Sequence, residues 1–567
     1  MIASTGHQQF DAIVIGSGIS GGWAAKELTE RGLAVLVLER GSQIEHGRDY
    51  HGEHVPEWKL PFNGKPPREL YEQQYDVQQR CYVFSEANRQ FFNNDALNPY
   101  VTDDGKPFTW IRADVVGGRS LLWGRQTYRW CAQDFTANAT DGHGIPWPIG
   151  YQDLAPWYSH VERFAGISGQ AEGLAQLPDS EFLPPMQMNA LEKLIKTRLH
   201  KYAPDITMTI GRAAILTQDH HKRAACHYCG TCERGCSTGS YFSTQSATLP
   251  AAEATGRLTL KPDSVVERLV HDASGCRIEE VHVINSRTME RERFSARLFF
   301  LCASTVGSTQ ILMNSASEQH PNGLGNRSGA LGRYLMDHIW GVTRVGIFLD
   351  AMDRDVVGFR PNGTYIPRFR NLSGQDDDAD FVRGYGYQAH SMRLGWSSTF
   401  RKRGIGASYK ESLRKPGPWI WALAGFGEVL PRATNRMYLH PTRVDRFGIP
   451  QVVFDCEWGD NEAMMISDMK ASGERILRAA GAVRIMDIRD AATPGTGVHE
   501  MGTARMGDNA DEAVLNAHNQ VHGIPNLFVT DGSCMTSSSC VNPSLTYMAL
   551  TARACDFAAS LLRSASV

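Results

Sequence analysis

The stretch Asp11-Ala-Ile-Val-Ile-Gly-Ser-Gly-Ile-Ser-Gly21 joins a short apolar run directly to the pattern G-x-G-x-x-G. A helical pattern follows, and a second apolar run, Ala34-Val-Leu-Val-Leu38, ends in the acid Glu39. Strand, glycine loop, helix, strand and acid make the dinucleotide-binding fingerprint in its required order. We therefore predict a Rossmann-like unit that binds FAD or NAD; the alternative is a glycine turn with a structural role only.

The residues of this fingerprint have separate physical roles. Gly16 allows the tight turn after the strand, Gly18 lets the backbone approach a pyrophosphate, and Gly21 lets the helix pack closely on the strand. The N-terminus of the helix then faces the negative charge of the pyrophosphate. Glu39 can accept hydrogen bonds from both hydroxyls of an adenosine ribose.

Two kinds of sequence pattern alternate along the rest of the chain. Residues 295–302 form another apolar run and residues 303–307 open a helix, which indicates a second strand-to-helix unit. Residues 340–460 alternate apolar and polar positions and are rich in aromatics, as is typical of an antiparallel sheet. Residues 495–554 return to glycine-rich strands and helices. We predict an α/β fold, a Rossmann-like nucleotide-binding domain with an inserted antiparallel-sheet substrate domain.

We expect the nucleotide-binding domain to be discontinuous in sequence. The predicted segments are 1–170, 215–330 (with the cysteine cluster 226–236) and 491–567 for this domain, and 171–214 and 331–490 for the substrate domain. Within the first segment, the turn that begins at Trp147 is expected to lead into a helix capped near Pro156.

Composition excludes several classes of protein. The 567 residues include 42% apolar and 21% charged residues, the balance of a globular protein rather than a disordered chain. A net charge of −3 leaves no broad basic surface for nucleic acid. No window approaches 18 consecutive apolar residues, so no membrane span is expected. Residues 1–10 lack a basic region followed by an apolar stretch, so we expect no signal peptide and a cytoplasmic location.

Motifs near the end of the chain point to a known family. They are His499-Glu-Met-Gly-Thr503, Asn526-Leu-Phe-Val-Thr-Asp-Gly-Ser533 and Cys540-Val-Asn-Pro-Ser-Leu-Thr546. Together with the fingerprint, the segment Val115-Val-Gly-Gly-Arg-Ser-Leu-Leu-Trp-Gly124 and residues 147–158, they resemble the glucose–methanol–choline (GMC) oxidoreductases over nearly the whole chain. The resemblance implies the GMC fold and bound FAD.

The resemblance also implies roles for single residues. His499 and Asn542, which lies eleven residues after Asp531, correspond to the pair that faces N5 of the flavin. Asp531 corresponds to the aspartate that binds the ribityl-phosphate region, at the N-terminus of the closing helix. A neutral imidazole can take the proton of an alcohol as hydride leaves its carbon, so we assign the base to His499. An Asn amide cannot act as a base, so Asn542 is expected to orient the substrate oxygen.

The glycine-rich segment 115–124 is expected to pass close to FAD, through Gly117, Gly118, Ser120 and Trp123. The alternative is a glycine-rich turn beneath the core. Some sugar-oxidising relatives bind FAD covalently through a His placed before the Trp of this segment. Leu122 stands at that position, so FAD is expected to be held non-covalently.

Four of the twelve cysteines lie within eleven residues, as Cys226-x2-Cys229-x2-Cys232-x3-Cys236. This spacing is typical of ferredoxin-type sites and predicts a [3Fe-4S] or [4Fe-4S] cluster. The segment also resembles the iron–sulfur segment of bacterial flavin-dependent glucose dehydrogenases, whose pattern Cys226, Cys232 and Cys236 match while Cys229 is additional. A zinc site and unmetallated structural thiols are the alternatives.

An iron–sulfur centre favours a dehydrogenase, because such a centre passes single electrons to another protein such as a cytochrome. Residues 117–126 and 141–147 most resemble the large subunit of bacterial glucoside 3-dehydrogenases, which oxidise the C3 hydroxyl of pyranose sugars and glycosides. The resemblance implies a sugar or glycoside substrate and a small, signal-bearing partner subunit, with a periplasmic location if the two are exported together. Trp396, Trp419 and Trp421 suit either stacking on a sugar or core packing.

Two other functions stay open at this point. An oxygen-using pyranose or C-glycoside oxidase would use the same flavin and the same pair, His499 and Asn542. A flavin-bound electron-transfer subunit would have no substrate of its own.

Overall fold

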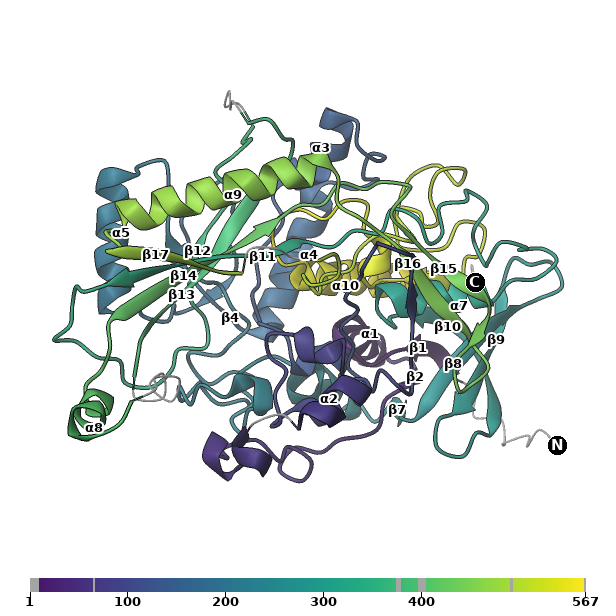
Figure 1. Ribbon diagram of the computed structural model, residues 1–567. Helices are drawn as coiled ribbons and strands as arrows, with labels where there is room; N and C mark the ends of the chain where they lie inside the picture. Colours follow the sequence, from purple (N-terminus) through teal and green to yellow (C-terminus); the bar gives the residue numbers. More distant parts are fainter. Residues whose placement is uncertain (1–9, 65–66, 374–378, 396–403, 490–492, 565–567) are drawn as a thin grey trace.

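The structure is a computed structural model that describes residues 10–64, 67–373, 379–395, 404–489 and 493–564. Two main β-sheets lie beside each other, with helices packed around both (Figure 1). We call them the mixed sheet and the antiparallel sheet. Across the described residues, no helix combines the length and the apolar run that crossing a bilayer requires.

The mixed sheet has the strand order β7-β2-β1-β10-β9-β8, with β18 also paired to β10. β1, β2, β7, β18 and the second half of β10 pair in parallel, whereas β9 pairs antiparallel with the first half of β10 and with β8. The strands are β1 Phe10–Ile15, β2 Val35–Leu38, β7 Leu258–Lys261, β8 Ser264–His271, β9 Ile278–Asn285, β10 Arg291–Leu301 and β18 Leu527–Val529.

Burial along β10 explains this change of partner. Its first residues alternate between exposed and half-buried positions, and its last four are buried without a break. Alternation suits an antiparallel pair with one solvated face, and a continuous buried run suits parallel strands covered on both faces. One apolar stretch therefore forms the centre of the mixed sheet, as the sequence predicted for residues 295–302.

The antiparallel sheet has the order β17-β11-β14-β13-β12-β6. Its strands are β6 Thr209–Ile210, β11 Ile339–Phe348, β12 Thr364–Ile366, β13 Tyr385–Arg393, β14 Trp419–Gly427 and β17 Arg484–Arg489. Two sheets of these types confirm the predicted fold class. The domain boundaries stay a prediction.

The structure differs from the sequence prediction at residues 450–455. This strand, β16, pairs antiparallel with β15 and parallel with β3, outside the antiparallel sheet. Alternation of apolar and polar residues predicts a half-buried strand but not its partner, so the prediction for residues 340–460 was too simple. The strands outside the two main sheets are β3 Val101–Thr102, β4 Ile167–Ser168, β5 Phe182–Leu183, β15 Arg436–Val444 and β16 Pro450–Asp455.

A second difference concerns the helix expected near Pro156. This helix, α4, begins at Tyr151, and Pro156 lies inside it. The Asp153 carboxylate accepts a hydrogen bond from the backbone N–H of Gly150 at 2.8 Å, which caps the helix at that earlier position. The α-helices are α1 Ile19–Glu30, α2 Arg68–Gln74, α3 Ala132–Asp141, α4 Tyr151–Ala165, α5 Ala190–Tyr202, α6 Leu249–Glu253, α7 Thr305–Asn314, α8 Ala407–Arg414, α9 Asp460–Ala479 and α10 Ser544–Arg563.

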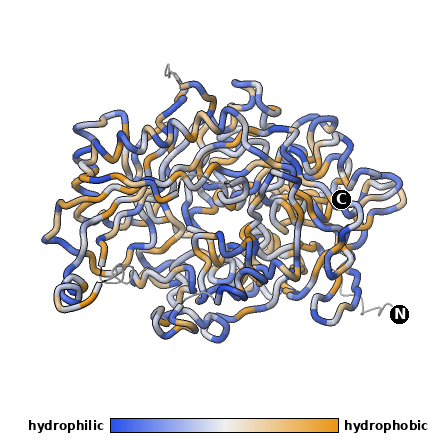
Figure 2. The backbone as a smooth tube through the Cα atoms, viewed as in Figure 1, coloured by the Kyte–Doolittle hydropathy of each residue, from blue (hydrophilic) through white to orange (hydrophobic). Residues whose placement is uncertain are grey.

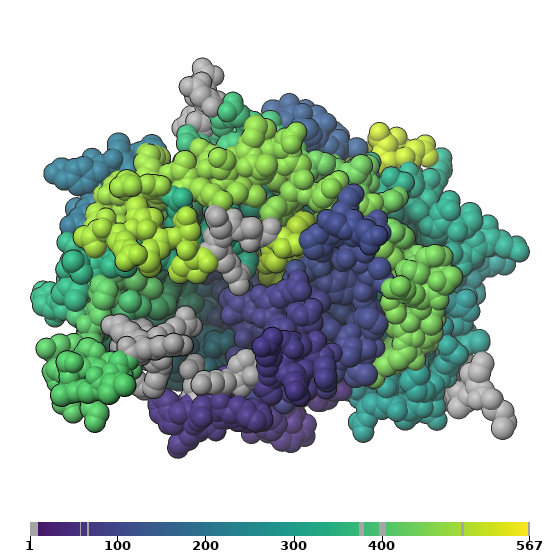
Figure 3. All heavy atoms as spheres, viewed as in Figure 1, coloured from purple at the N-terminus to yellow at the C-terminus, as the bar shows by residue number. Residues whose placement is uncertain are grey.

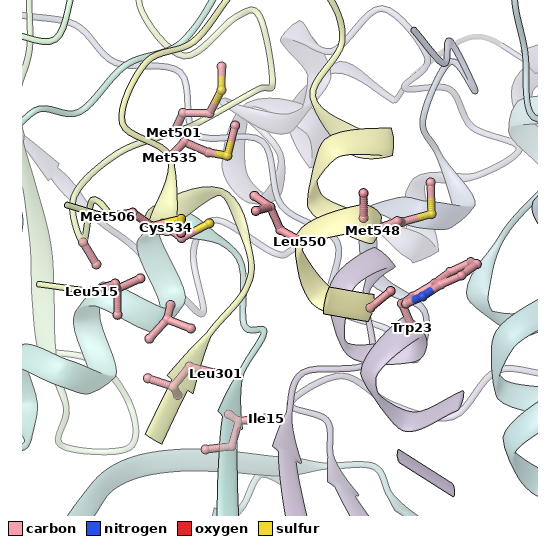
Figure 4. Close-up of a cluster of buried hydrophobic side chains, with 14 of the residues drawn as sticks. Ile15, Trp23, Leu301, Met501, Met506, Leu515, Cys534, Met535, Met548 and Leu550 are labelled. Atoms are coloured by element: carbon pink, nitrogen blue, oxygen red, sulfur yellow. The ribbon is translucent and has the colours of Figure 1, made fainter. Parts of the chain in front are cut away.

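The main core lies where the mixed sheet meets helices from both ends of the chain. α10 packs against α1 and α4. Figure 4 shows Trp23 of α1 near Met548 of α10 and Leu550 on the other side of that helix, with Ile15 and Leu301 at the strand ends below. In Figure 2, hydrophobic residues concentrate in such interior elements, whereas many peripheral loops are hydrophilic. This packing holds the ends of β1 and β10 rigidly beside the C-terminal segment.

The antiparallel sheet has its own core, covered by α5 and α9. Trp419 and Trp421 are fully buried there, and their indole N–H groups donate to the carbonyl of Ala351 and to the hydroxyl of Thr364. These two tryptophans are therefore core residues and not a stacking surface. Trp396 lies outside the described residues.

Candidate active site

The carboxyl ends of β1, β2 and β10 open onto a cavity of about 1010 Å³. Ligands of open α/β sheets bind at this edge, where the loops after the strands meet. The structure brings most of the predicted site residues together on its wall, namely Gly16, Gly18, Glu39, Gly118, Ser120, Trp123, His499, Asp531 and Asn542. Gly21 and Gly117 do not line the cavity. The space-filling view shows one hollowed face between the purple N-terminal residues and the green residues around α8 (Figure 3).

The fingerprint glycines sit in the positions that their roles require. Gly16 has φ +99°, and a Cβ there would lie 2.4 Å from the carbonyl oxygen of Cys302. A Cβ on Gly21 would lie 1.9 Å from the carbonyl oxygen of Gly16, so α1 packs directly on the turn. A Cβ on Gly18 would meet no protein atom within 4 Å and would point into open space beside the N-terminus of α1.

Glu39 is held in place by the glycine loop. Its Oε2 accepts hydrogen bonds from the backbone N–H and hydroxyl of Ser17 at 2.8 and 2.6 Å, and its Oε1 accepts from the N–H of Gly41 at 2.8 Å. Burial raises the pKa of this carboxyl. A carboxylate has lone pairs beyond these three bonds, so the fixed oxygens can also accept from ligand hydroxyls.

The second glycine segment packs against the first. A Cβ on Gly118 would lie 3.5 Å from the Cα of Gly18, and the N–H of Gly117 donates to the Ser17 hydroxyl at 2.8 Å. The Ser120 hydroxyl donates to the carbonyl of Gly117 at 2.6 Å, and the Trp123 indole donates to the carbonyl of Phe242 at 2.9 Å. These bonds fix the part of the cavity wall that residues 118–123 form.

Asp531 lies on the wall, but its place differs from the prediction. It caps the short 3-10 helix Gly532–Cys534, whereas the closing helix α10 begins thirteen residues later, at Ser544. Its Oδ1 accepts from the backbone N–H and hydroxyl of Ser533 at 3.0 and 2.6 Å, and its Oδ2 accepts from the Ser308 hydroxyl at 2.5 Å. Asp531 lies close to α10 in the sequence, but the sequence did not predict the short 3-10 helix between them.

His499 and Asn542 lie side by side at the cavity. Nε2 of His499 is 3.3 Å from Nδ2 of Asn542, and Oδ1 of Asn542 accepts from Nε2 of Gln388 at 2.5 Å. Burial lowers the pKa of His499 well below its usual value, and His338 and Arg119 lower it further. The imidazole is therefore neutral near pH 7, with Nε2 facing the Asn542 amide.

The loop that carries His499 is anchored by buried charges. The Asp337 carboxylate accepts from the backbone N–H groups of Gly497 and His499 at 2.8 and 2.9 Å. Burial and the neighbouring Glu500 raise the pKa of Asp337 to about 7. Arg119 and Glu500 form an ion pair at 2.6 Å, which ties the glycine-rich segment to this loop.

Sequence reasoning missed several of these residues, namely Arg119, Asp337, His338, Gln388 and Glu500. One signal was present, because Asp337 and His338 are adjacent polar residues directly before the apolar strand β11. Gln388 lies in the middle of β13 and carries no local signal.

The cysteine segment has a different character. Cys226, Cys232 and Cys236 pack against an apolar cluster that contains Met186 and Tyr241, and burial raises the pKa of the Cys232 thiol to about 11. All four cysteines of the segment, including Cys229, are free. Within the residues that the structure describes, no group of three or more His, Cys, Asp or Glu side chains is arranged to hold a metal ion. The thiols as placed therefore do not fit the predicted iron–sulfur cluster.

Comparison with known proteins settles the family. Sequence models described as GMC oxidoreductase match residues 10–340 and 431–551. The chain belongs to the GMC oxidoreductase family. A 2-methyl-1,2-propanediol dehydrogenase from Mycolicibacterium austroafricanum is 29% identical, over 98% of this chain and 96% of that protein. The fructose dehydrogenase large subunit of Gluconobacter japonicus is 24% identical, over 96% of this chain and 97% of that subunit.

Solved structures show the same fold. Pyridoxine 4-oxidase from Mesorbium loti superposes with a TM-score of 0.60 at 15% identity, covering 97% of this chain and 99% of that one. The cavity of this GMC oxidoreductase fits FAD, because the open position at Gly18 leaves room for a pyrophosphate and the fixed Glu39 carboxylate can accept from a ribose. Leu122, before Trp123, lines the same cavity, and non-covalent attachment stays a prediction.

Proposed function

We propose that this GMC oxidoreductase is an FAD-dependent dehydrogenase that oxidises a hydroxyl group of a sugar or glycoside, with C3 of a pyranose as the position oxidised. FAD, when bound, supplies the hydride acceptor. The observation that carries the proposal is the placement of a neutral imidazole and an amide side by side on the wall of the FAD cavity, at His499 and Asn542.

His499 is suited to take the hydroxyl proton. Because its pKa lies well below the usual value, the ring is unprotonated at neutral pH, and Nε2 can accept a proton as the alcohol is oxidised. Its backbone is held by Asp337, so the ring approaches the cavity from a fixed direction. The loss of a hydroxyl proton to this nitrogen is the step that the protein itself catalyses.

Asn542 is suited to orient the substrate oxygen. Gln388 donates to Oδ1 of Asn542, which leaves the NH₂ group to face His499 and the cavity. Nδ2 can therefore donate to the hydroxyl oxygen while Nε2 of His499 accepts its proton. The two groups hold one oxygen at two points.

The composition of the cavity wall supports a sugar substrate. Amide and imidazole side chains at Asn362, Gln388 and His390 line it and can bond to several hydroxyls. Tyr82, Trp340 and Phe426 also line it as a row of rings, with centroids 5.6 Å apart for Tyr82–Trp340 and 6.3 Å apart for Trp340–Phe426. Such rings can pack against the apolar faces of a pyranose. The related fructose dehydrogenase large subunit is named for a sugar substrate.

The route of the electrons beyond the flavin stays a prediction. We propose a separate protein acceptor and a small partner subunit, in line with the multi-subunit relative named above. No step is assigned to an iron–sulfur cluster, since the described thiols do not form a metal site. Iron analysis and electron paramagnetic resonance of anaerobically purified protein test, independently of the substrate, whether the cysteine segment holds iron.

Anaerobic titration of the FAD-bound protein tests the proposed function. We expect pyranose sugars and glycosides to bleach the flavin absorbance, with a 3-keto product identified by NMR. Bleaching by small aliphatic diols but by no sugar would contradict the substrate class. Hydrogen peroxide formed in air as fast as substrate is consumed would identify an oxidase instead of a dehydrogenase.

A further inference from the structure

His338 contacts the proposed base from the side away from Asn542. It is fully buried, one residue before β11, and its Nδ1 lies 2.9 Å from Nδ1 of His499. Its Nε2 lies 3.1 Å from the carbonyl oxygen of Ser538 and 3.0 Å from that of Ser539. Both ring nitrogens of His338 are thus engaged by protein groups.

The carbonyl oxygens decide which nitrogen of His338 carries the proton. A carbonyl can only accept, so Nε2 of His338 must be the N–H donor. Burial lowers the pKa of His338 to about 4, so the ring is neutral and its Nδ1 has a lone pair and no hydrogen. That lone pair faces Nδ1 of His499, which must then be the N–H donor.

The same logic continues to the other side of His499. A neutral imidazole with its proton on Nδ1 has a lone pair on Nε2. Nδ2 of Asn542 faces that lone pair at 3.3 Å, and Gln388 fixes the amide in this orientation through Oδ1. A chain of hydrogen bonds thus runs from the Ser538 and Ser539 carbonyls through the two histidines and Asn542 to Gln388. One placement of the protons satisfies all of them.

We propose that His338 is a positioning residue that holds His499 in the tautomer with its proton on Nδ1 and its lone pair on Nε2, the nitrogen on the side of Asn542. This inference rests on the proposed function, because it assumes that His499 is the base. His499 becomes positively charged when it takes up the substrate proton. The neutral Nδ1 of His338 can still accept the hydrogen bond from Nδ1 of His499 in that state.

Few charged groups face this pair of rings. The ring of Phe426 packs edge-on to His338 with centroids 6.2 Å apart, and the charged group that acts on His338 is Asp134, through space. Arg119 acts on His499, while the Asp337 carboxylate points to backbone N–H groups of the 497–499 loop. No carboxylate of the described residues is hydrogen-bonded to either ring, so an uncharged histidine supplies the orientation that an aspartate supplies in a Ser-His-Asp triad.

A matched pair of variants tests the role. His338→Gln keeps an amide N–H for the two carbonyls and an amide oxygen for His499, whereas His338→Leu keeps similar volume without either group. We expect the Leu variant to retain FAD and to reduce flavin about 100-fold more slowly with KM nearly unchanged, because a misplaced or wrongly protonated base costs about that much or more. The Gln variant is expected to stay within about tenfold of wild type, with the same pH profile.

Nitrogen-15 NMR of ring-labelled, FAD-bound wild type tests the tautomer directly, without substrate. We expect a protonated Nδ1 and an unprotonated Nε2 on His499, identified by loss of its signals in a His499→Asn protein. The opposite tautomer, or a Gln variant as slow as the Leu variant, would overturn the proposal. If wild type shows the expected tautomer but no sugar reduces the flavin, the proposed function fails while the positioning role of His338 stands.

Discussion

The glycine loop 16–21 and the cysteine segment 226–236 are the two most regular motifs of the sequence, and the structure treats them differently. The glycine loop is locked between β1 and α1, with backbone atoms in the places that its spacing implies. The cysteine segment contains little regular structure besides the short 3-10 helix Cys232–Arg234, and its thiols do not form a metal site in the described chain. The spacing of a motif is sufficient to predict a site that the backbone itself forms. It is insufficient to predict a site at which side chains must converge.

The largest effect is expected when a side chain is added to the glycine loop. Gly21→Val places a Cβ 1.9 Å from the carbonyl oxygen of Gly16, so we expect the free energy of unfolding to fall by about 1–3 kcal/mol or more and little soluble protein to form. Gly18→Val is the matched control, because a Cβ at this position meets no protein atom within 4 Å. It should fold normally by circular dichroism yet purify without FAD colour. A yellow, active Gly18→Val protein would contradict the assignment of the pyrophosphate site.

The next largest effect concerns the catalytic loop. His499→Ala should keep FAD and fold but reduce flavin about 10²–10⁴-fold more slowly in anaerobic stopped-flow measurements, the usual contribution of a positioned base. Higher pH should restore part of the rate, because the substrate hydroxyl then loses its proton more easily. Asn542→Ala should cost less, since it removes orientation but not the base. A wild-type rate for His499→Ala at neutral pH would remove His499 from the mechanism.

The buried histidines also predict a pH effect on stability. The pKa of His338 is about 4 in the folded protein and near 6.5 in an unfolded chain, so the unfolded state binds more protons between these values. The contribution of neutral His338 to stability is therefore complete above about pH 6.5 and is lost as pH falls toward 4. We expect the melting temperature of wild type to fall by roughly 1–3 °C more than that of His338→Gln over this interval. Parallel pH curves for the two proteins would contradict the burial of a neutral ring.

The smallest effect on flavin reduction is expected at the cysteine segment. Cys232→Ser should reduce flavin with sugar within about twofold of the wild-type rate in a single anaerobic turnover, because none of the four thiols lines the FAD cavity. Selective loss of multiple turnovers with a cytochrome, while a small dye that reaches the flavin still works, would contradict the conclusion that these thiols form no metal site. A joint fall in both acceptor activities and in stability would instead indicate zinc or structural thiols.

The contrast between these motifs also shows which features of the protein can be predicted from its sequence and which cannot. The nucleotide-binding unit was predictable because all of its parts lie within residues 10–39 and follow from strand, turn and helix preferences. His499, Asn542 and Asp531 were found only through a family resemblance, since a single His or Asn carries no periodic signal. The aromatic side chains show the same limit, because Trp419 and Trp421 were open to two interpretations until burial decided between them.

By itself, then, the sequence determined the fold class and the nucleotide-binding fingerprint, and through a family resemblance it predicted the pair His499 and Asn542. Only the tertiary structure decided what surrounds that pair. His338, Gln388, His499 and Asn542 come from four separated segments, and their contacts depend on the pairing of β11, β13 and β14 and on the loop that Asp337 anchors. Such contacts form between residues 43 to 201 positions apart, so strand register and packing set them and local preferences do not.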